Sequence, residues 1–141
     1  MCKRGDIILV SHYEEHGRTL PRHTFIVIND DGGEVQGVSF DLIGLVMSSL
    51  KSKEQTKRKL SYPGNLPIAA TEQNITNSNY GNNKDGYIKC EQFYYFKKNQ
   101  LDYTVIGYVD DEIMGIIEEY INELIDNAVE FTQNIENLPK E

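Results

Sequence analysis

Residues 22–30 read Arg-His-Thr-Phe-Ile-Val-Ile-Asn-Asp, and the rest of the chain is expected to pack around them. The centre of this stretch, residues 25–28, is a continuous apolar run, with Pro21 before it and Asp-Asp-Gly-Gly after it. A short apolar run between such breakers is typical of a strand that is buried on both faces. Arg22 stands at the entrance of the strand, where rigid scaffolds often present functional residues. A solvated charge at a strand end is the alternative role for Arg22.

Further apolar or β-prone segments predict the neighbours of this strand. They lie at 7–10, at 35–50 with Gly44 as a bulge or close backbone approach, at 66–70, at 87–96 and at 103–108. The polar connections between them are a loop at 11–21, a charged excursion at 52–59 and a long mobile loop at 71–86. The pleat period of two puts Lys89 and Glu91 on one face of the 87–96 strand.

The segment that begins at Asp110 predicts a helix, because Asp110 is a suitable N-cap and acidic residues fill the first turn. Its apolar stripe is expected to consist of Ile113, Ile116, Ile117, Tyr120, Leu124 and Ala128. Residues 134–141 are expected to form a frayed tail. The fold class is therefore mainly β with a C-terminal helix, a small and mostly antiparallel sheet or barrel. We expect one domain over residues 1–126 and an acidic C-terminal extension or tail at 127–141.

Length and composition restrict the class of protein. A chain of 141 residues is long enough for one domain with a real core. It contains no apolar run near the roughly 20 residues that cross a bilayer, so no membrane association is expected. Cys2 and Cys90 offer neither a disulfide framework nor metal-ligand spacing, which fits the cytoplasm.

The charge is divided unevenly along the chain. Residues 109–141 hold ten acidic residues and one lysine, a charge of −9, whereas the body before them carries +1, for a total of −8. An anionic ligand on the body is therefore not excluded. A basic cluster within the body contains Lys51, Lys53, Lys57, Arg58 and Lys59. It is expected to be a solvated face or a track for a phosphate backbone.

Four segments in one order resemble the PemK/MazF family of bacterial toxins, which shares an SH3-like barrel with the gyrase poison CcdB. The matching segments are Lys-Arg-Gly-Asp-Ile at 3–7, the strand at 22–30, Ile-Lys-Cys-Glu-Gln at 88–92, and the helix lead-in at 106–117 with its Asp-Asp-Glu pattern. The resemblance extends over roughly residues 1–124. Two departures are His23, where the family has a proline, and the missing arginine after the Glu-Gln pair.

The resemblance implies a toxin of a type II toxin–antitoxin pair that cleaves single-stranded RNA without metal, through a 2′,3′-cyclic phosphate. That reaction needs a base, an acid and donors to the phosphorane. The family's motif residues fall on Arg22 as phosphorane stabiliser, on Ser48, on the acid/base pair Lys89 and Glu91, and on the loop histidine His16. By themselves, Lys89 and Glu91 would be an ordinary surface pair.

The expected RNA contacts are Arg18, His23, Ser49, Lys51, Lys53 and Tyr80. No cofactor is expected, and no metal, because the three histidines fit no ligand pattern. The expected partners are single-stranded RNA, a second copy of the chain in a homodimer and a cognate antitoxin, all in the cytoplasm. The homodimer is expected to use the aromatic run at 93–96. The alternatives are a CcdB-like toxin that binds gyrase without catalysis, and a degenerate family member that only binds a partner protein.

Overall fold

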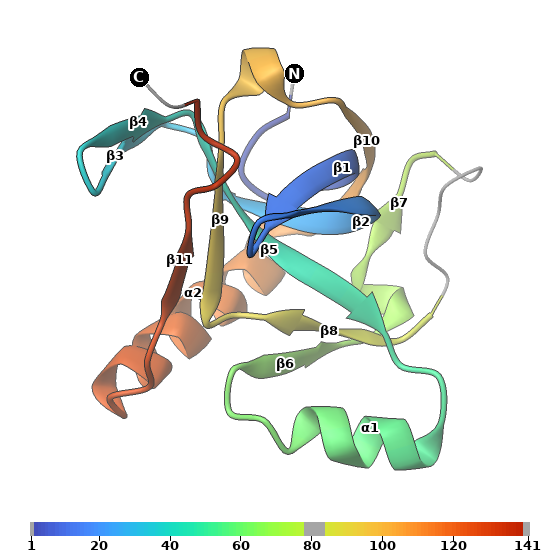
Figure 1. Cartoon of the computed structure of the whole chain (residues 1–141). Coiled ribbons are helices and arrows are strands. Elements are labelled where there is room, and N and C mark those ends of the chain that lie inside the picture. The colour runs from blue at the N-terminus through green and yellow to red at the C-terminus, as the bar shows by residue number, and fades with distance from the viewer. Residues whose placement is uncertain (1, 78–83, 140–141) are drawn as a thin grey trace.

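The computed structural model describes residues 2–77 and 84–139 and consists of a large mixed sheet, a small two-stranded arm and two α-helices (Figure 1). The strands are β1 (Asp6–Glu15), β2 (Arg18–Asn29), β3 (Gly33–Val35), β4 (Val38–Phe40), β5 (Leu42–Ser49), β6 (Asn65–Ile68), β7 (Asn74–Ile75), β8 (Gly86–Lys89), β9 (Gln92–Phe96), β10 (Tyr103–Tyr108) and β11 (Thr132–Asn134). The helices are α1 (Lys53–Leu60) and α2 (Asp111–Asp126), with short 3-10 turns η1 (Ala70–Glu72) and η2 (Lys98–Gln100). Neither α-helix in the described ranges is long and apolar enough to cross a bilayer.

The strand β2 lies at the centre of the molecule and is buried on both faces, as predicted. Phe25, Ile26 and Val27 have no exposed surface. Ile26 packs into a core that α2 completes, whereas Phe25 and Val27 pack into a second core with Tyr94. Because the pleat sends successive side chains to opposite faces, a continuous apolar run serves two cores at once.

The strands of the large sheet follow the order β11-β9-β5-β2-β1-β10-β7, and β8 connects β5 to β6. Pairing is antiparallel except between β11 and β9, so the predicted mostly antiparallel architecture with a C-terminal helix is confirmed. The register of β2 and β5 shifts between Val27 and Asn29, beside Gly44. This irregularity confirms the predicted bulge, whereas a Cβ on Gly44 would make only an ordinary contact with the Phe25 side chain, at 3.4 Å.

The predicted polar loop at 11–21 is wrong, because β1 and β2 continue through it as a long hairpin. Glu15 pairs with Arg18, which leaves His16 and Gly17 as a two-residue turn. Both turn residues have positive φ, 50° and 76°, and such turns match the twist of the flanking strands. The apolar Tyr13, which is buried between the polar His12 and Glu14, was the feature of the sequence that indicated a strand here.

The described parts of the predicted loop at 71–86 are also more ordered than predicted. They include part of η1, and β7 pairs with β10 through Ile75 and Gly107. Gly107 permits this approach, because a Cβ there would lie 2.6 Å from the carbonyl oxygen of Asn74. Residues 78–83 lie outside the described ranges.

The helix α2 begins after Asp110 as predicted, but its buried stripe is rotated from the predicted one. Its buried residues are Met114, Ile117, Ile121 and Leu124. Ile116 is 46% exposed, and Ala128 lies beyond the helix with a φ of 56°. Three isoleucines at 113, 116 and 117 fit two neighbouring helix phases equally well. Packing against the sheet selects the phase that buries Met114 and Ile121 and leaves Ile116 exposed.

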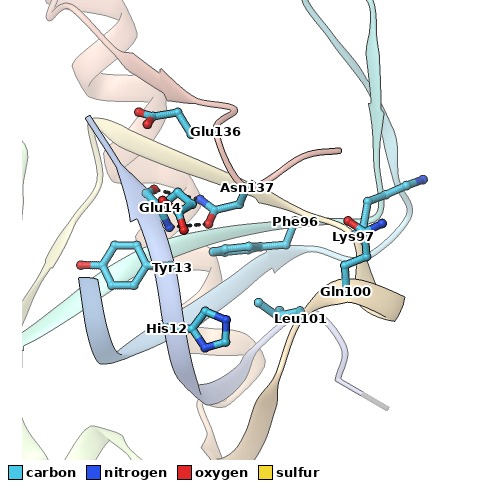
Figure 2. A pocket seen from close by; sticks show the side chains of 9 residues that line it. All are labelled: His12, Tyr13, Glu14, Phe96, Lys97, Gln100, Leu101, Glu136 and Asn137. Atoms are coloured by element: carbon cyan, nitrogen blue, oxygen red, sulfur yellow. Dashed lines mark hydrogen bonds between the residues drawn. The ribbon is translucent and has the colours of Figure 1, made fainter. Parts of the chain in front are cut away.

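The predicted frayed tail at 134–141 is wrong for the residues that the structure describes. Asn134 pairs with Tyr94 in β9, and Leu138 is only 5% exposed. The Asn137 side chain binds the backbone of Glu14 twice, with distances of 2.7 and 3.1 Å (Figure 2). The segment is extended, so its apolar residues are buried without the spacing of a helix.

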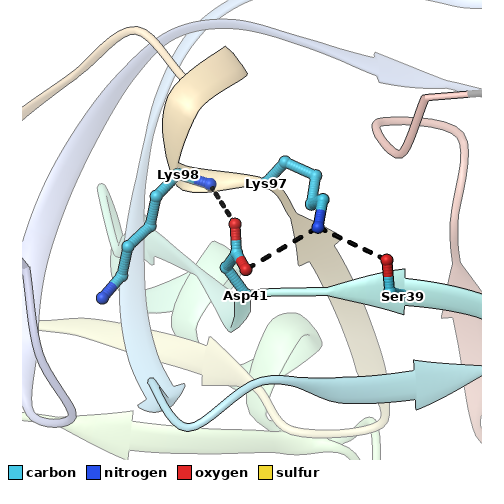
Figure 3. Close-up of polar contacts among 4 residues, drawn as sticks. All are labelled: Ser39, Asp41, Lys97 and Lys98. Atoms are coloured by element: carbon cyan, nitrogen blue, oxygen red, sulfur yellow. Dashed lines mark hydrogen bonds and ion pairs between the residues drawn. The ribbon is translucent and has the colours of Figure 1, made fainter.

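The β3–β4 arm is tied to the end of β9 by a polar cluster (Figure 3). The Asp41 carboxylate accepts a hydrogen bond from the backbone N–H of Lys98 at 3.0 Å and lies 3.8 Å from Lys97 Nζ. Lys97 also donates to Ser39 Oγ at 3.3 Å. These contacts lie away from the predicted site residues, and we assign them a structural role.

Replacing Ile117 and Ile116 by alanine, one at a time, tests the phase of α2. Ile117 is 0% exposed, so Ile117→Ala leaves a cavity and is expected to cost about 2–5 kcal/mol of unfolding free energy. Ile116→Ala, at a position 46% exposed, should stay within about 0.5 kcal/mol of the original. Urea denaturation followed by circular dichroism measures both changes, and equal losses would contradict the observed phase.

Candidate functional site

The candidate site opens where β2 and β5 separate. Their pairing ends at Thr24 and Met47. Arg22 and His23 precede this last pair on β2, and Ser48 and Ser49 follow it on β5. Because β5 then continues with β8 as its partner, the predicted residues of two distant segments gather around one opening.

This opening is a groove of about 440 Å³, here called the Arg22 groove. Its polar lining includes Arg22, His23, Ser48, Ser49, Lys51 and Lys59. Three of its lining residues are cationic, and among the described residues no aspartate or glutamate lines it. Arg22, Lys51 and Lys59 form no ion pair within the described part of the chain. The groove is therefore locally basic on a protein whose net charge is −8.

The helix α1 supplies one wall of this groove. It starts at its N-cap Ser52, whose Oγ accepts from the backbone N–H of Gln55 at 3.1 Å. The Gln55 side chain in turn accepts from the backbone N–H of Lys51 at 2.6 Å. At the other end, the buried Asn65 donates to the carbonyl oxygen of Lys59 at 2.8 Å. These contacts fix the backbone on both sides of the basic helix.

A second opening of about 270 Å³, here called the Lys89 hollow, adjoins the Arg22 groove. Lys59 and Tyr87 line both, and the hollow adds Lys89, Glu91 and Gln92. The prediction that Lys89 and Glu91 share one strand face is wrong, because β8 ends at Lys89 and β9 begins at Gln92. A turn at residues 90–91 nevertheless brings both side chains to the same hollow.

Glu91 is held against Gly64. One of its carboxylate oxygens, Oε2, is buried and has no hydrogen-bond partner among the described residues. A Cβ on Gly64 would overlap this carboxylate, so a larger residue there would require the Glu91 side chain to move. A buried polar atom without a partner carries a desolvation cost, and such atoms occur at functional sites.

Folding favours the neutral form of His23. Its pKa lies below the ordinary value of 6.5, chiefly because the ring is buried, and the nearby Lys89 lowers it further while Glu15 opposes the shift. The Nδ1 atom accepts a hydrogen bond from the backbone N–H of Thr24 at 2.8 Å. The proton of the neutral ring is therefore on Nε2, which makes this nitrogen a donor.

Among the described residues, three of the predicted site residues do not line these openings. His16 and Arg18 are exposed at the end of the β1–β2 hairpin, and Lys53 is exposed at the start of α1. Tyr80 lies outside the described residues. The roles predicted for these four residues stay predictions.

The sequence reasoning missed Gln55, Lys59 and Tyr87 as lining residues. Lys59 was noticed only as part of a basic run. Ser52 followed three residues later by Gln55 resembles a helix N-terminus, and a helix there would have placed Gln55 and Lys59 on one face, four residues apart.

Within residues 2–77 and 84–139, no group of three or more His, Cys, Asp or Glu side chains is placed to hold a metal ion. Both cysteines are free and buried. Burial and the nearby Glu91 raise the pKa of Cys90 to about 12, so its thiol is not ionised near neutral pH and is a poor nucleophile.

The lowered pKa of His23 predicts a loss of stability in acid. The unfolded chain takes up this proton near pH 6.5, above the pKa of the folded state, so the free energy of unfolding should fall as the pH drops below about 6.5. His23→Gln should reduce this fall, whereas His12→Gln, at an exposed position, should leave it unchanged. Urea denaturation at pH 7.5 and 5.5 measures the fall of the unfolding free energy between the two pH values. An equal fall in the original protein and in both variants would refute the assignment.

Comparison with known proteins gives one family. A search of curated proteins found no match. The family model described as PemK-like, MazF-like toxin of type II toxin-antitoxin system matches residues 3–125, which include every residue of the Arg22 groove and the Lys89 hollow. The chain therefore belongs to the PemK-like, MazF-like toxins of type II toxin–antitoxin systems.

Proposed function

We propose that this toxin is an endoribonuclease that cleaves single-stranded RNA without a metal ion, in the Arg22 groove. The observation that carries the proposal is the unpaired basic lining of this groove on an acidic protein. Such a groove attracts a phosphate backbone, whereas the acidic remainder of the surface repels it. The single-stranded form of the substrate fits an open groove that bases and sugars can enter.

In the proposed reaction, the ribose 2′-OH attacks the adjacent phosphorus, and the 5′-oxygen of the next nucleotide leaves. The product ends are a 2′,3′-cyclic phosphate and a 5′-OH. Negative charge builds on the non-bridging oxygens of the phosphorane. The guanidinium of Arg22 offers forked donors to these oxygens, and Ser48 adds a hydroxyl donor beside it.

Proton transfer is assigned to Lys89 and Glu91 as a pair, without dividing the roles of acid and base. Both line the hollow that continues from the Arg22 groove, so a nucleotide that spans the two openings has donors at its phosphate and titratable groups beside it. The unpartnered Oε2 of Glu91 supports a role in chemistry rather than in stability. Lys51, Lys59 and the neutral His23 are assigned to phosphate and base contacts.

The proposed assembly is a homodimer that a cognate antitoxin neutralises in the cytoplasm. The aromatic run expected to form the dimer interface does not supply it. Tyr94, Tyr95 and Phe96 are at most 5% exposed within the single chain, and Phe93 packs on Phe131 at a ring distance of 5.4 Å. The interface of the proposed dimer must therefore use other surface.

Incubation of the purified protein with a long RNA in EDTA tests the reaction. We expect cleavage to continue, because the proposed catalytic groups all belong to the protein, and to leave 5′-OH ends. End mapping by ligation and phosphorylation identifies the products. Loss of cleavage on chelation, or 5′-phosphate ends, would count against the mechanism. Gyrase–DNA complexes trapped by the protein, without RNA cleavage, would favour the CcdB-like alternative.

Arg22→Ala is expected to lower the cleavage rate by about 10²–10³-fold, or roughly 3–4 kcal/mol, because a donor to the phosphorane is lost. Arg22→Lys should recover little, since a point charge does not reproduce the planar fork. The melting temperature should hold in both variants, because Arg22 is exposed. Arg18→Ala is the matched control, as this arginine lies on the same strand but outside the groove, and its effect should be much smaller. Near-normal cleavage by Arg22→Ala would remove Arg22 from the site.

A further inference from the structure

The C-terminal segment at 129–139 lies beyond the residues that the family model matches, yet it is docked on the sheet. β11 runs parallel to β9, with Thr132 paired to Gln92 (Figure 1). Leu138 packs into a small core with Phe40 and Tyr95. These contacts hold the segment along an edge of the sheet.

From this position the segment reaches the turn of the β1–β2 hairpin. The Glu136 carboxylate accepts two hydrogen bonds at 2.8 Å, one from the backbone N–H of His16 and one from that of Gly17. Asn137 binds both the N–H and the carbonyl oxygen of Glu14, and the close-up shows this pairing (Figure 2). The segment therefore binds the backbone at three positions near the end of the hairpin, Glu14, His16 and Gly17.

The same hairpin end is connected to the candidate site through Glu15. Its carboxylate accepts a hydrogen bond from the hydroxyl of Tyr94 at 2.6 Å, and this hydroxyl lies 3.3 Å from Oε1 of Gln92. Gln92 lines the Lys89 hollow. The charge of Glu15 also acts on His23, which lines the Arg22 groove. Glu15 therefore connects the hairpin end with residues that line both openings.

Contacts from the C-terminal segment stabilise the backbone conformation of the turn. His16 has a φ of 50°, in the left-handed region that residues other than glycine rarely occupy. Such residues persist when surrounding contacts hold them. Glu136 is well suited to this task, since one carboxylate accepts from both turn amides and an anion strengthens each bond.

We infer that Glu136 and Asn137 are positioning residues of the active site, and that the C-terminal segment holds the β1–β2 hairpin in the arrangement that RNA cleavage requires. This inference rests on the proposed function. The two residues act through Glu15, Tyr94 and Gln92 rather than by contact with the reacting phosphate. The site of this toxin thus depends on a segment outside the part of the chain that defines its family.

The test compares Glu136→Ala, Glu136→Gln and Glu130→Ala in the full-length protein. Glu130→Ala is the matched control, because Glu130 lies in the same segment, is exposed and forms no contact among the described residues. Two readouts are needed: kcat and KM for RNA cleavage, and amide hydrogen exchange at Glu14, His16 and Gly17 measured by NMR. The second readout does not depend on activity.

In Glu136→Ala we expect faster exchange at His16 and Gly17 and a kcat lower by about ten-fold, within the roughly 10²-fold that a misplacement of about 1 Å can cost. KM and the melting temperature should be retained, since β11 and Leu138 keep their contacts. Glu136→Gln keeps one acceptor and should lie between the original and Glu136→Ala, and Glu130→Ala should match the original.

Full kcat in Glu136→Ala, or unchanged exchange at the turn, would overturn the inference. A large loss of melting temperature in both Glu136 variants would also overturn it, because Glu136 would then be a general stabilising residue. If the original protein leaves RNA intact, the proposed function fails instead, and the exchange data still decide whether Glu136 holds the hairpin.

Discussion

Burial of β2 on both faces is the constraint on which the rest of the structure depends. Ile26 faces the core closed by α2, and Phe25 and Val27 face the core that contains Tyr94. A slip of one residue would exchange the two faces, so both cores fix the register together. Arg22, at the open end of this strand, therefore has a backbone position that is set by packing several residues away.

The electrostatics of the molecule separate into two regions. The net negative charge comes from residues 109–141, which include α2 and the C-terminal segment, whereas Arg22, Lys51 and Lys59 gather in the Arg22 groove. This separation makes net charge a poor guide to the ligand, because the local field at the groove is opposite in sign to the charge of the whole. The RNA substrate proposed above would meet this basic lining at the Arg22 groove.

Residues far apart in the chain cooperate at the candidate site. The groove joins the ends of β2 and β5 with α1, and the hollow beside it adds the turn between β8 and β9. The hairpin of β1 and β2 then connects these openings to Glu136, which lies near the C-terminal end of the described residues. Each connection is a short polar contact between segments that strand pairing has already brought together.

The sequence by itself determined the strands around residues 7–10, 25–28 and 103–108 and the start of α2, because apolar runs and acidic residues in the first turn of a helix act locally. It also identified Arg22, Ser48, Lys89 and Glu91 as candidates, through the family resemblance. Only the tertiary structure decided the phase of α2, the hairpin through residues 11–21 and the docking of β11. These features depend on partners distant in the sequence. The three isoleucines of α2 permit two helix phases, and only packing against the sheet selects one of them. A short polar strand is stable only when a neighbouring strand pairs with its backbone hydrogen-bonding groups.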